Sequence, residues 1–327
     1  MDKLKNKFAI GCLVQFYEIE LVEEYINSLK ISLEVTENKE NVLIDFCLNI
    51  NEDLEKLDSS KITMDEITKR FKLMLEDFEN VTLNINKDNI YTIADYRRDF
   101  NEKYCELTDV LMWGESDSLI PRQTWYILDK LHDSVKEKTP KYVSFFGTCK
   151  MWDKSWEILE HPDFTVKPFK DIGNRVETKD WWSLRYNMKQ HEMDEINEKT
   201  EELDIRTTNQ LKFNGCGLVI SSSVVKSGVN IPRSIFFIHE DTAFMNNCLI
   251  MFRGQLPQYI IKNILLVHNR KHVKKRMYIS GEDDINPGDV GGARKTHDWY
   301  TRANQLSEWN AHNLHTQEKF YSWKDII

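Results

Sequence analysis

The sequence predicts an α/β fold in which helices flank a mostly parallel β-sheet. Short apolar segments without polar alternation, such as residues 8–16 and 41–48, are typical of strands buried on both faces of a sheet. Segments with helical spacing of apolar residues follow them, at residues 21–29 and 64–78. Strands and helices that alternate at this length favour parallel strands joined by helical crossovers.

The same alternation continues along the chain, with one irregular region. Further strands are predicted at residues 81–85, 110–113, 142–147, 213–220 and 260–267. Further helices are predicted at residues 95–105, 121–138, 221–225, 242–251 and 298–310. The polar, aromatic residues 151–210 are interpreted as a helical and aromatic insertion or lid over the sheet. We therefore divide the chain into a main domain at 1–280, which contains this insertion, and a C-terminal loop and helix extension at 281–327.

Bulk composition limits the functional classes. The 327 residues carry a formal net charge of −9, which argues against nonspecific coating of nucleic acid, although a local basic patch can still hold a polyanion. No apolar run approaches the roughly 20 residues that a membrane helix requires. The six cysteines are scattered without a CxxC pair and predict buried reduced thiols. We expect a cytoplasmic protein without integral membrane contact.

Potential metal ligands stand at the ends of three predicted apolar segments. One segment ends in Glu115 and Asp117, a second in Glu240 and Asp241, and a third in His268. The carboxyl ends of strands in an open α/β sheet meet at the edge where ligands bind. Carboxylates and an imidazole suit Mn²⁺ or Mg²⁺, with open positions left for phosphate oxygens.

Each of these features also has a purely structural interpretation. An acidic turn is common after a strand. The alternative interpretation of Asp241 is a helix N-cap, and His268 taken alone would be interpreted as a buried histidine at a strand end. Arg97 and Arg98, on a polar helix, either face solvent or approach an anionic ligand. The basic run that begins at residues 270–271, directly after His268, favours a ligand role for the histidine because cations there would neutralise a diphosphate.

The order of these motifs resembles that of the GT-A fold glycosyltransferases, particularly the family 2-like inverting enzymes. The resemblance covers residues 8–276 and rests on four landmarks, which are the first strand ending in Tyr17-Glu18, the acidic Glu115-Ser116-Asp117 at the place of the DxD motif, the glycine-containing Asn214-Gly215-Cys216-Gly217 followed by His239-Glu240-Asp241, and His268 at the place of the C-terminal metal-binding histidine. One departure is that the first acid of the DxD position is Glu115 rather than Asp.

The resemblance implies an inverting, metal-dependent transfer of a sugar from a UDP-sugar donor. It implies Asp241 as the general base, with Glu240 orienting the acceptor or the loop. The metal ligands would be Asp117 and His268, with Glu115 a less direct partner on the metal, the ribose or water. The nucleotide-sugar contacts expected from it are Gln15, Tyr17, Glu18, Asn51 or the acids after it, Arg97, Arg98, Glu115, Gly215, Arg270 and Lys271.

The acceptor stays open at this point. It is a soluble saccharide, a lipid-linked glycan, a protein, or a hydroxymethylated base in DNA. The last would be typical of a phage enzyme that acts in the host cytoplasm, with Trp181 or Trp182 stacking on or replacing a flipped base. The net charge weighs against a DNA acceptor. The sequence determines neither the donor sugar nor the oligomeric state.

Two other functions compete with this one. A nucleotidyltransferase on a similar sheet would carry a glycine-rich, basic loop after the first strand, where residues 15–20 read Gln-Phe-Tyr-Glu-Ile-Glu. A non-catalytic sugar- or nucleic-acid-binding protein would have no need of acids at the ends of several strands, which disfavours that alternative.

Overall fold

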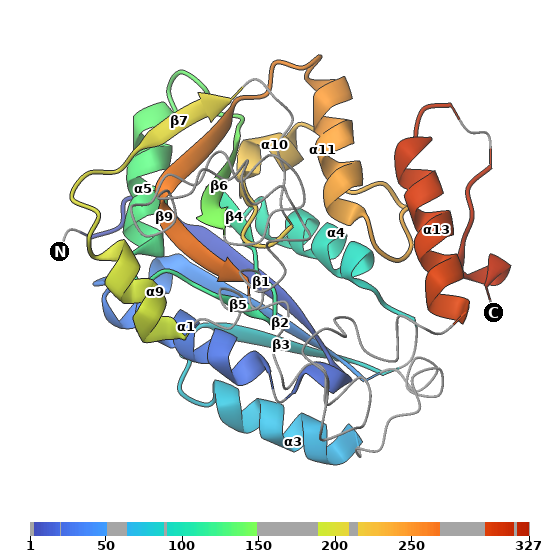
Figure 1. Cartoon of the computed structure of the whole chain (residues 1–327), viewed down its shortest axis with the longest axis horizontal. Helices are drawn as coiled ribbons and strands as arrows, with labels where there is room; N and C mark the ends of the chain where they lie inside the picture. Colours follow the sequence, from blue (N-terminus) through green and yellow to red (C-terminus); the bar gives the residue numbers. More distant parts are fainter. Residues whose placement is uncertain are drawn as a thin grey trace, which may run out of the picture.

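The described strands form one curled, mixed sheet with helices on both faces (Figure 1). The computed structural model describes residues 3–19, 21–50, 64–87, 90–148, 189–208, 215–268, 298–316 and 319–326. The strands are β1 (Phe8–Gln15), β2 (Val42–Asn49), β3 (Val81–Asn86), β4 (Val110–Trp113), β5 (Ser118–Leu119), β6 (Val143–Thr148), β7 (Ile205–Thr208), β8 (Val219–Ser221) and β9 (Gln258–His268). Their order is β3-β2-β1-β4-β8-β6-β9-β5, and β7 pairs with β9 outside this path.

Helices connect these strands in the alternation that the sequence predicts. They are α1 (Val22–Glu34), α3 (Met64–Leu75), α4 (Ile93–Tyr104), α5 (Thr124–Val135), α9 (Gln190–Asn197), α10 (Ser222–Lys226), α11 (Glu240–Met251) and α13 (Asp298–His312), with short 3-10 turns at Phe16–Glu18, Lys39–Asn41 and Trp323–Asp325. The predicted α/β class, a sheet flanked by helices, is confirmed.

One half of the sheet is entirely parallel. β1 lies between β2 and β4, and β3 extends the sheet beyond β2, all in parallel pairing. β1, β2 and β4 are largely apolar, while β3 alternates apolar and polar residues. Helical crossovers return the chain to the same edge, so the carboxyl ends of these parallel strands meet there. The register aligns Gln15 with Asn49 and Asn49 with Asn86 at that edge.

The other half mixes directions. β8 inserts between β4 and β6, antiparallel to both, while β6 and β9 are parallel. β5 and β7 both pair with β9 in antiparallel fashion. As a result, the C-terminal end of β9 returns to the acidic turn that follows β4.

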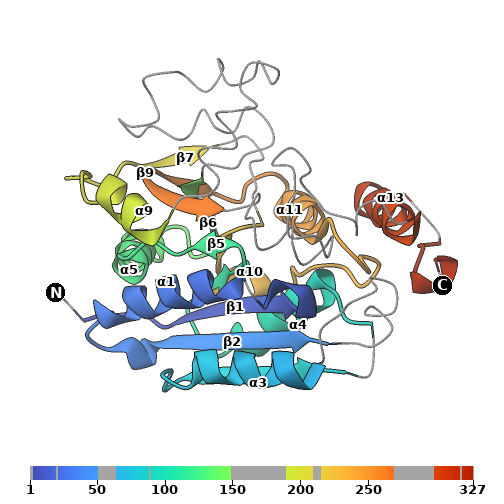
Figure 2. The same ribbon diagram turned by 60° about the horizontal axis from the view of Figure 1, so that its bottom comes forward.

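Two hydrophobic layers cover the two faces of the sheet. On one face α1, α3 and α5 pack on alternate residues of β1 and β2, and α1 and α3 run along these strands (Figure 2). On the other face α4, α10 and α11 pack against the remaining residues, with Trp113 in edge contact with Phe244 of α11. Burial of each large apolar side chain contributes about 1.5–3 kcal/mol to the stability of the fold. The two layers together therefore fix the strands whose ends carry the polar groups.

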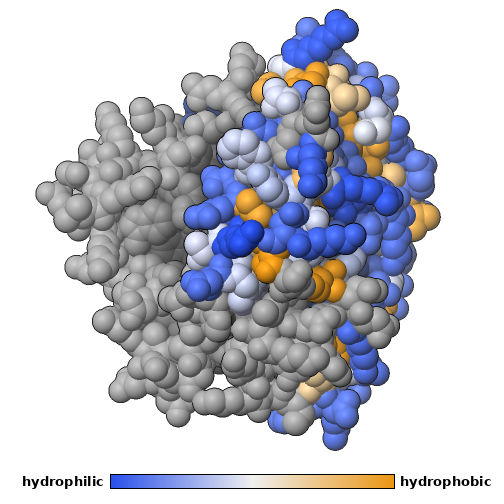
Figure 3. Space-filling view, turned by 90° about the vertical axis from the view of Figure 1, so that its right-hand side faces the viewer, coloured by the Kyte–Doolittle hydropathy of each residue, from blue (hydrophilic) through white to orange (hydrophobic). Residues whose placement is uncertain are grey.

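The C-terminal helix α13 packs beside α11 on the side away from the sheet (Figures 1 and 2). Its inner face forms an aromatic cluster with Phe236 and Phe237, in which Trp299 and Trp323 take part. On the face of the molecule toward α13, the described surface is mostly hydrophilic with small, separate hydrophobic patches (Figure 3). Through the aromatic cluster, α13 packs against residues 236–237, which precede α11.

The structure refines the bounds of several predicted elements. Residues 234–239, for which the sequence allows a strand or a loop, form a loop, and α11 begins at Glu240, two residues before the predicted start. His239, not Asp241, takes the N-cap position of α11, so the N-cap interpretation of Asp241 is wrong. Within the predicted insertion, residues 189–208 form α9 and β7, while its tryptophan-rich part lies outside the described residues.

Two of the compositional expectations concern the described residues directly. Among them, no helix is both long and apolar enough to span a bilayer. The described cysteines, Cys12, Cys47, Cys105, Cys216 and Cys248, are buried thiols.

Candidate active site

The acidic turn after β4 meets His268 at the end of β9. The His268 imidazole Nε2 lies 2.9 Å from Glu115 Oε2 and 3.0 Å from Asp117 Oδ1. Asp117 is 4% exposed and His268 is 2% exposed, so this is a buried group of polar atoms rather than a solvated turn. The acidic turn is closed by the Ser118 backbone N–H, which donates to the Glu115 carbonyl at 3.0 Å.

Strand register explains why His268 arrives there. β5 begins directly after the acidic turn, and its Ser118 pairs with His268 in the antiparallel ladder with β9. A shift of one residue would turn the imidazole to the opposite face of the sheet. In the sequence, Leu119 and Ile120 are only a short apolar pair before Pro121. The pairing of β5 with β9 shows that this segment places His268 beside the acidic turn.

Arg97 of α4 lies at the centre of the acidic groups. Its guanidinium pairs with Glu240 through Nη1 and with Glu115 through Nη2 at 2.9 Å, and Nη2 also donates to the Gly215 carbonyl at 3.0 Å. The Trp113 ring lies beneath it, 4.6 Å from Cζ. Arg97 is 2% exposed. Burial acts to lower the pKa of Arg97, but Glu240, Glu115 and Asp241 raise it, and the net direction is upward. Arg97 thus holds the two acidic motifs together as a permanent cation.

Gly215 is required by close approach. A Cβ atom at this position would lie 2.8 Å from Arg97 Nη1 and 3.0 Å from Asp241 Oδ2. Any side chain would push apart the arginine and the carboxylate. Gly215 stands at this point because the chain pairs with the end of β4: the Gly217 backbone N–H donates to the Trp113 carbonyl at 2.9 Å. The predicted site residues Arg97, Glu115, Gly215, Glu240 and Asp241 are therefore brought together.

Glu240 and Asp241 form the first turn of α11. Glu240 is buried, and burial raises the pKa of its carboxyl to about 7; Arg97 opposes this rise, while Asp241 adds to it. Asp241 is more exposed, and its Oδ1 accepts from the Thr242 backbone N–H at 2.7 Å. Its other oxygen faces Gly215. The two neighbouring acids therefore differ: Glu240 is a buried partner of Arg97, and Asp241 is the accessible carboxylate.

The backbone that presents these acids is unusual. His239 has φ 71°, in the left-handed region that non-glycine residues rarely adopt. Its Nε2 hydrogen-bonds Asn304 Oδ1 of α13 at 3.1 Å, and Ser307 Oγ of α13 donates to the Ile238 carbonyl. Strain of this kind persists only where surrounding contacts hold it. The C-terminal helix therefore positions the start of α11, a role that the sequence does not indicate.

Polar side chains continue across the parallel half of the sheet at its carboxyl edge. Asn49 Nδ2 donates to Gln15 Oε1 at 3.0 Å, and Asn86 Nδ2 donates to Asn49 Oδ1 at 2.8 Å. The predicted residue Glu18 accepts from the Gln15 backbone N–H at 3.0 Å. Asn49 and Asn86 were not predicted. Both are polar residues that end an apolar strand, which is the signal that identifies them.

The other predicted contact residues either lie apart from the acidic cluster or are not fully described. Arg98 donates to the backbone carbonyls of Ile231, Pro232 and Ile235 and pairs with Asp95, so its described partners are in the loop before α11 and not in the acidic cluster. Tyr17 lies in the turn after β1, where its backbone alone is described. Asn51, Arg270 and Lys271 lie outside the described residues.

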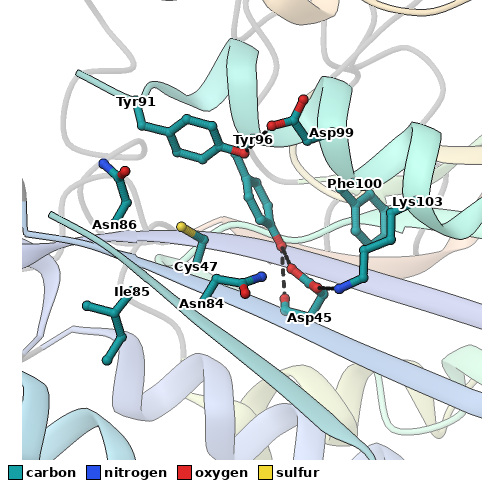
Figure 4. Close-up of a pocket in the computed structure, with 10 residues that line it drawn as sticks. All are labelled: Asp45, Cys47, Asn84, Ile85, Asn86, Tyr91, Tyr96, Asp99, Phe100 and Lys103. Atoms are coloured by element: carbon teal, nitrogen blue, oxygen red, sulfur yellow. Dashed lines mark hydrogen bonds and ion pairs between the residues drawn. The ribbon is translucent and has the colours of Figure 1, made fainter. Parts of the chain in front are cut away.

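A separate cavity of about 290 Å³ opens over β2 and β3, beside α4 (Figure 4). It is lined by Asp45, Cys47, Asn84, Ile85, Asn86, Tyr91, Tyr96, Asp99, Phe100 and Lys103. Asp45 is held there by Tyr96, by Lys103 at 2.9 Å and by the Tyr104 hydroxyl at 2.8 Å. Apart from Asn86, its lining does not include the groups of the acidic cluster or the amide row.

The donor atoms of the acidic cluster fit a divalent metal ion. Among the described residues, the ligand atoms of Glu115, Cys216 and His268 all lie within 4.8 Å of one another, and Asp117 adjoins His268. Carboxylate oxygens and an imidazole nitrogen are ordinary ligands for Mn²⁺. Cys216 was not predicted as part of the cluster. It reaches Glu115 because Gly215-Cys216-Gly217 runs alongside the end of β4.

Comparisons with known proteins give a limited result. No protein-family model and no curated protein matches this chain. Among solved structures it is similar to residues 1–349 of S. aureus TarS, with 10% sequence identity, a TM-score of 0.47, and 95% of this chain and 72% of that chain covered.

That TarS piece has also been solved in complex with UDP and with UDP-GlcNAc. The match to a longer TarS chain covers 44% of it. A mycobacterial protein is similar over 84% of this chain and 73% of its own, at 8% identity and a TM-score of 0.40.

Proposed function

We propose that this protein is an inverting glycosyltransferase that moves a sugar from a UDP-sugar to an acceptor hydroxyl. The observation that carries the proposal is the convergence of two acidic motifs and a glycine-containing segment on Arg97. Glu115 after β4, Gly215 before β8 and Glu240 at the start of α11 all contact this one guanidinium. They belong to two of the four landmarks on which the resemblance to GT-A enzymes rests, and they come from distant parts of the chain.

The donor's leaving group defines the first half of the site. Glu115, Asp117 and His268 would hold Mn²⁺ or Mg²⁺, which when bound would neutralise the charge that develops on the diphosphate. The row of Gln15, Asn49 and Asn86 offers amide donors and acceptors at the same edge of the sheet. Amide groups of this kind suit the recognition of a uracil ring, whose edge carries both donors and acceptors.

The acceptor's proton defines the second half. Asp241 would take the proton from the acceptor hydroxyl while that oxygen attacks the anomeric carbon. The bond between the anomeric carbon and the diphosphate oxygen breaks, and UDP leaves from the opposite face, which inverts the configuration. Arg97 and Glu240 would hold the Asp241 segment beside Gly215, where the chain has no side chain in the way.

Replacement of the base tests this function. Asp241→Asn should reduce transfer by about 10²–10⁴-fold, because general-base catalysis contributes that much, and should leave UDP binding nearly unchanged. UDP release and product formation measure the first quantity, and the shift of Tm by UDP with Mn²⁺ measures the second. Asp298→Asn, also in the first turn of a helix, is the matched control and should retain activity.

A panel of UDP-sugars, including UDP-GlcNAc, and of acceptors identifies the substrates. The acceptors should include saccharides, lipid-linked glycans, proteins and DNA with hydroxymethylcytosine. Unchanged turnover in Asp241→Asn removes Asp241 as the base. A Tm that UDP does not shift, with or without Mn²⁺, removes the donor assignment and the proposed function with it.

A further inference from the structure

The sulfur of Cys216 distinguishes this cluster from one built of oxygen and nitrogen alone. Cys216 is 3% exposed, and its Sγ lies within 4.8 Å of the donor atoms of both Glu115 and His268. The other two members are fixed by different strands, Glu115 by the turn after β4 and His268 by its pairing with Ser118. Three donors of three chemical types thus face one another at a spacing that a single ion can bridge.

The position of Cys216 is set by the backbone on both sides. Its neighbour Gly215 gives its carbonyl to Arg97, and the Gly217 N–H donates to the Trp113 carbonyl. Gly217 has φ 74° and a Cβ there would lie 2.5 Å from Leu266, so this residue must also be glycine. Two constrained glycines therefore hold the thiol between them, next to the acidic turn.

We propose that Cys216 is a ligand of the divalent metal and that the site selects a transition-metal ion over Mg²⁺. This inference rests on the proposed function, which places a metal here. Mg²⁺ prefers an all-oxygen octahedron, whereas a thiolate with imidazole and carboxylate suits softer ions such as Zn²⁺ and Co²⁺. On binding, the S–H bond breaks, a metal–sulfur bond forms, and the proton goes to solvent.

Cobalt substitution of the full-length protein is the direct test. Co²⁺ should produce visible d–d bands and a near-ultraviolet sulfur-to-cobalt charge-transfer band in the wild type. Cys216→Ser should lose the charge-transfer band and bind Co²⁺ at least about ten-fold more weakly, since even the outer partners of metal ligands contribute 10–100-fold to affinity. Cys105→Ser, at the end of α4 and bonded within its own helix, is the matched control and should keep both bands.

Thermal shift provides a second measurement. Co²⁺ should raise the Tm of the wild type more than Mg²⁺ does at equal concentration, and this preference should shrink in Cys216→Ser. If Cys216→Ser does not fold, the wild-type spectrum still decides, because d–d bands without a charge-transfer band exclude a sulfur ligand.

The outcomes separate this inference from the proposed function. Cobalt binding without the sulfur band, or a band that persists in Cys216→Ser, overturns the role of Cys216 and leaves sugar transfer intact. Equal stabilisation by Mg²⁺ and Co²⁺ overturns the selectivity. A wild type that binds no divalent ion overturns the inference, and the assay of UDP release then shows independently whether sugar transfer survives without metal.

Discussion

The two sides of Arg97 are built by different means. On the side of Glu115, the ligands sit at strand ends, and their positions follow from the pairing of β4 with β8 and of β5 with β9. On the other side, Glu240 and Asp241 begin a helix, and the loop before it, residues 234–239, belongs to no described strand. The proposed metal side is fixed by the backbone ladders of the sheet, while the side of the proposed base depends on side-chain contacts.

The loop before α11 has no described strand pairing, and side chains from α4 and α13 hold it in place instead. From α4, Arg98 binds the carbonyls of Ile231, Pro232 and Ile235. From α13, Asn310 donates to the Ser234 carbonyl at 2.7 Å, and Ser307 donates to that of Ile238. The difference teaches that backbone pairing alone holds the side of Glu115, whereas the position of Glu240 and Asp241 depends on side chains of α4 and α13.

Loss of Arg97 should break the junction between the two sides and have the largest effect. In Arg97→Met, Glu240 would be left buried beside Glu115 and Asp241 without a cation. Breaking a buried ion pair in this way costs about 3–5 kcal/mol. Urea unfolding measures the cost. The destabilisation should be smaller at acidic pH, because Glu240 can then take up a proton.

A surface arginine serves as the control for that variant. Arg122 is half exposed, and its Nη1 lies 3.8 Å from Glu198, so Arg122→Met should cost no more than about 1 kcal/mol. Adding Glu240→Gln to Arg97→Met should recover part of the lost stability, because the uncompensated charge is removed. Equal costs for the two arginines would contradict a central role for Arg97.

The pH dependence of stability sharpens the contrast between the two acids of α11. Burial raises the pKa of Glu240 from 4.5 to about 7. Between these values the unfolded chain releases the proton and the folded chain retains it, so the Glu240 contribution to stability is lost as pH rises, by up to about 1.4 kcal/mol per pH unit. Glu240→Gln should remove this slope in urea titrations between pH 4.5 and 7.

Glu308→Gln on the exposed face of α13 should leave the slope unchanged and is the control. If Glu240→Gln shows the wild-type slope, the proton does not reside on Glu240.

The parallel half of the sheet was predictable because its information is local. β1 and β2 are apolar runs and β3 alternates apolar and polar residues, and each is followed by a helix with its own periodicity, so residues 8–105 could be assigned element by element. Later in the chain, the polar residues after three further apolar segments pointed to Glu115, Glu240 and His268. The structure places Glu115 in contact with His268, and Arg97 joins Glu115 to Glu240. Local sequence patterns do not show which strands pair with one another in the mixed half of the sheet.

The residues that were missed depend on long-range pairing. Cys216 gives no signal in sequence, because its place in the cluster follows from an antiparallel contact with the end of β4, about a hundred positions earlier in the chain. Arg98 was grouped with Arg97 because the two are adjacent. On a helix, neighbouring residues point in directions about 100° apart, so one reaches the acids and the other the loop. The role of Asn304 is equally invisible without the docking of α13.

Removal of the contact between α13 and His239 should have the smallest effect, but it reports most directly on how the base is positioned. In Asn304→Ala the left-handed His239 loses its hydrogen-bond partner. A hydrogen bond contributes about 1 kcal/mol, which corresponds to roughly five-fold in kcat if it acts through the transition state. The KM for the UDP-sugar should not change, because the metal side is held by the sheet. Asn304→Asp keeps an acceptor oxygen for His239 and should restore kcat. A variant that alters KM for the donor as strongly as kcat would show that the two sides of Arg97 are not independent, and that docking of α13 sets the leaving-group side as well.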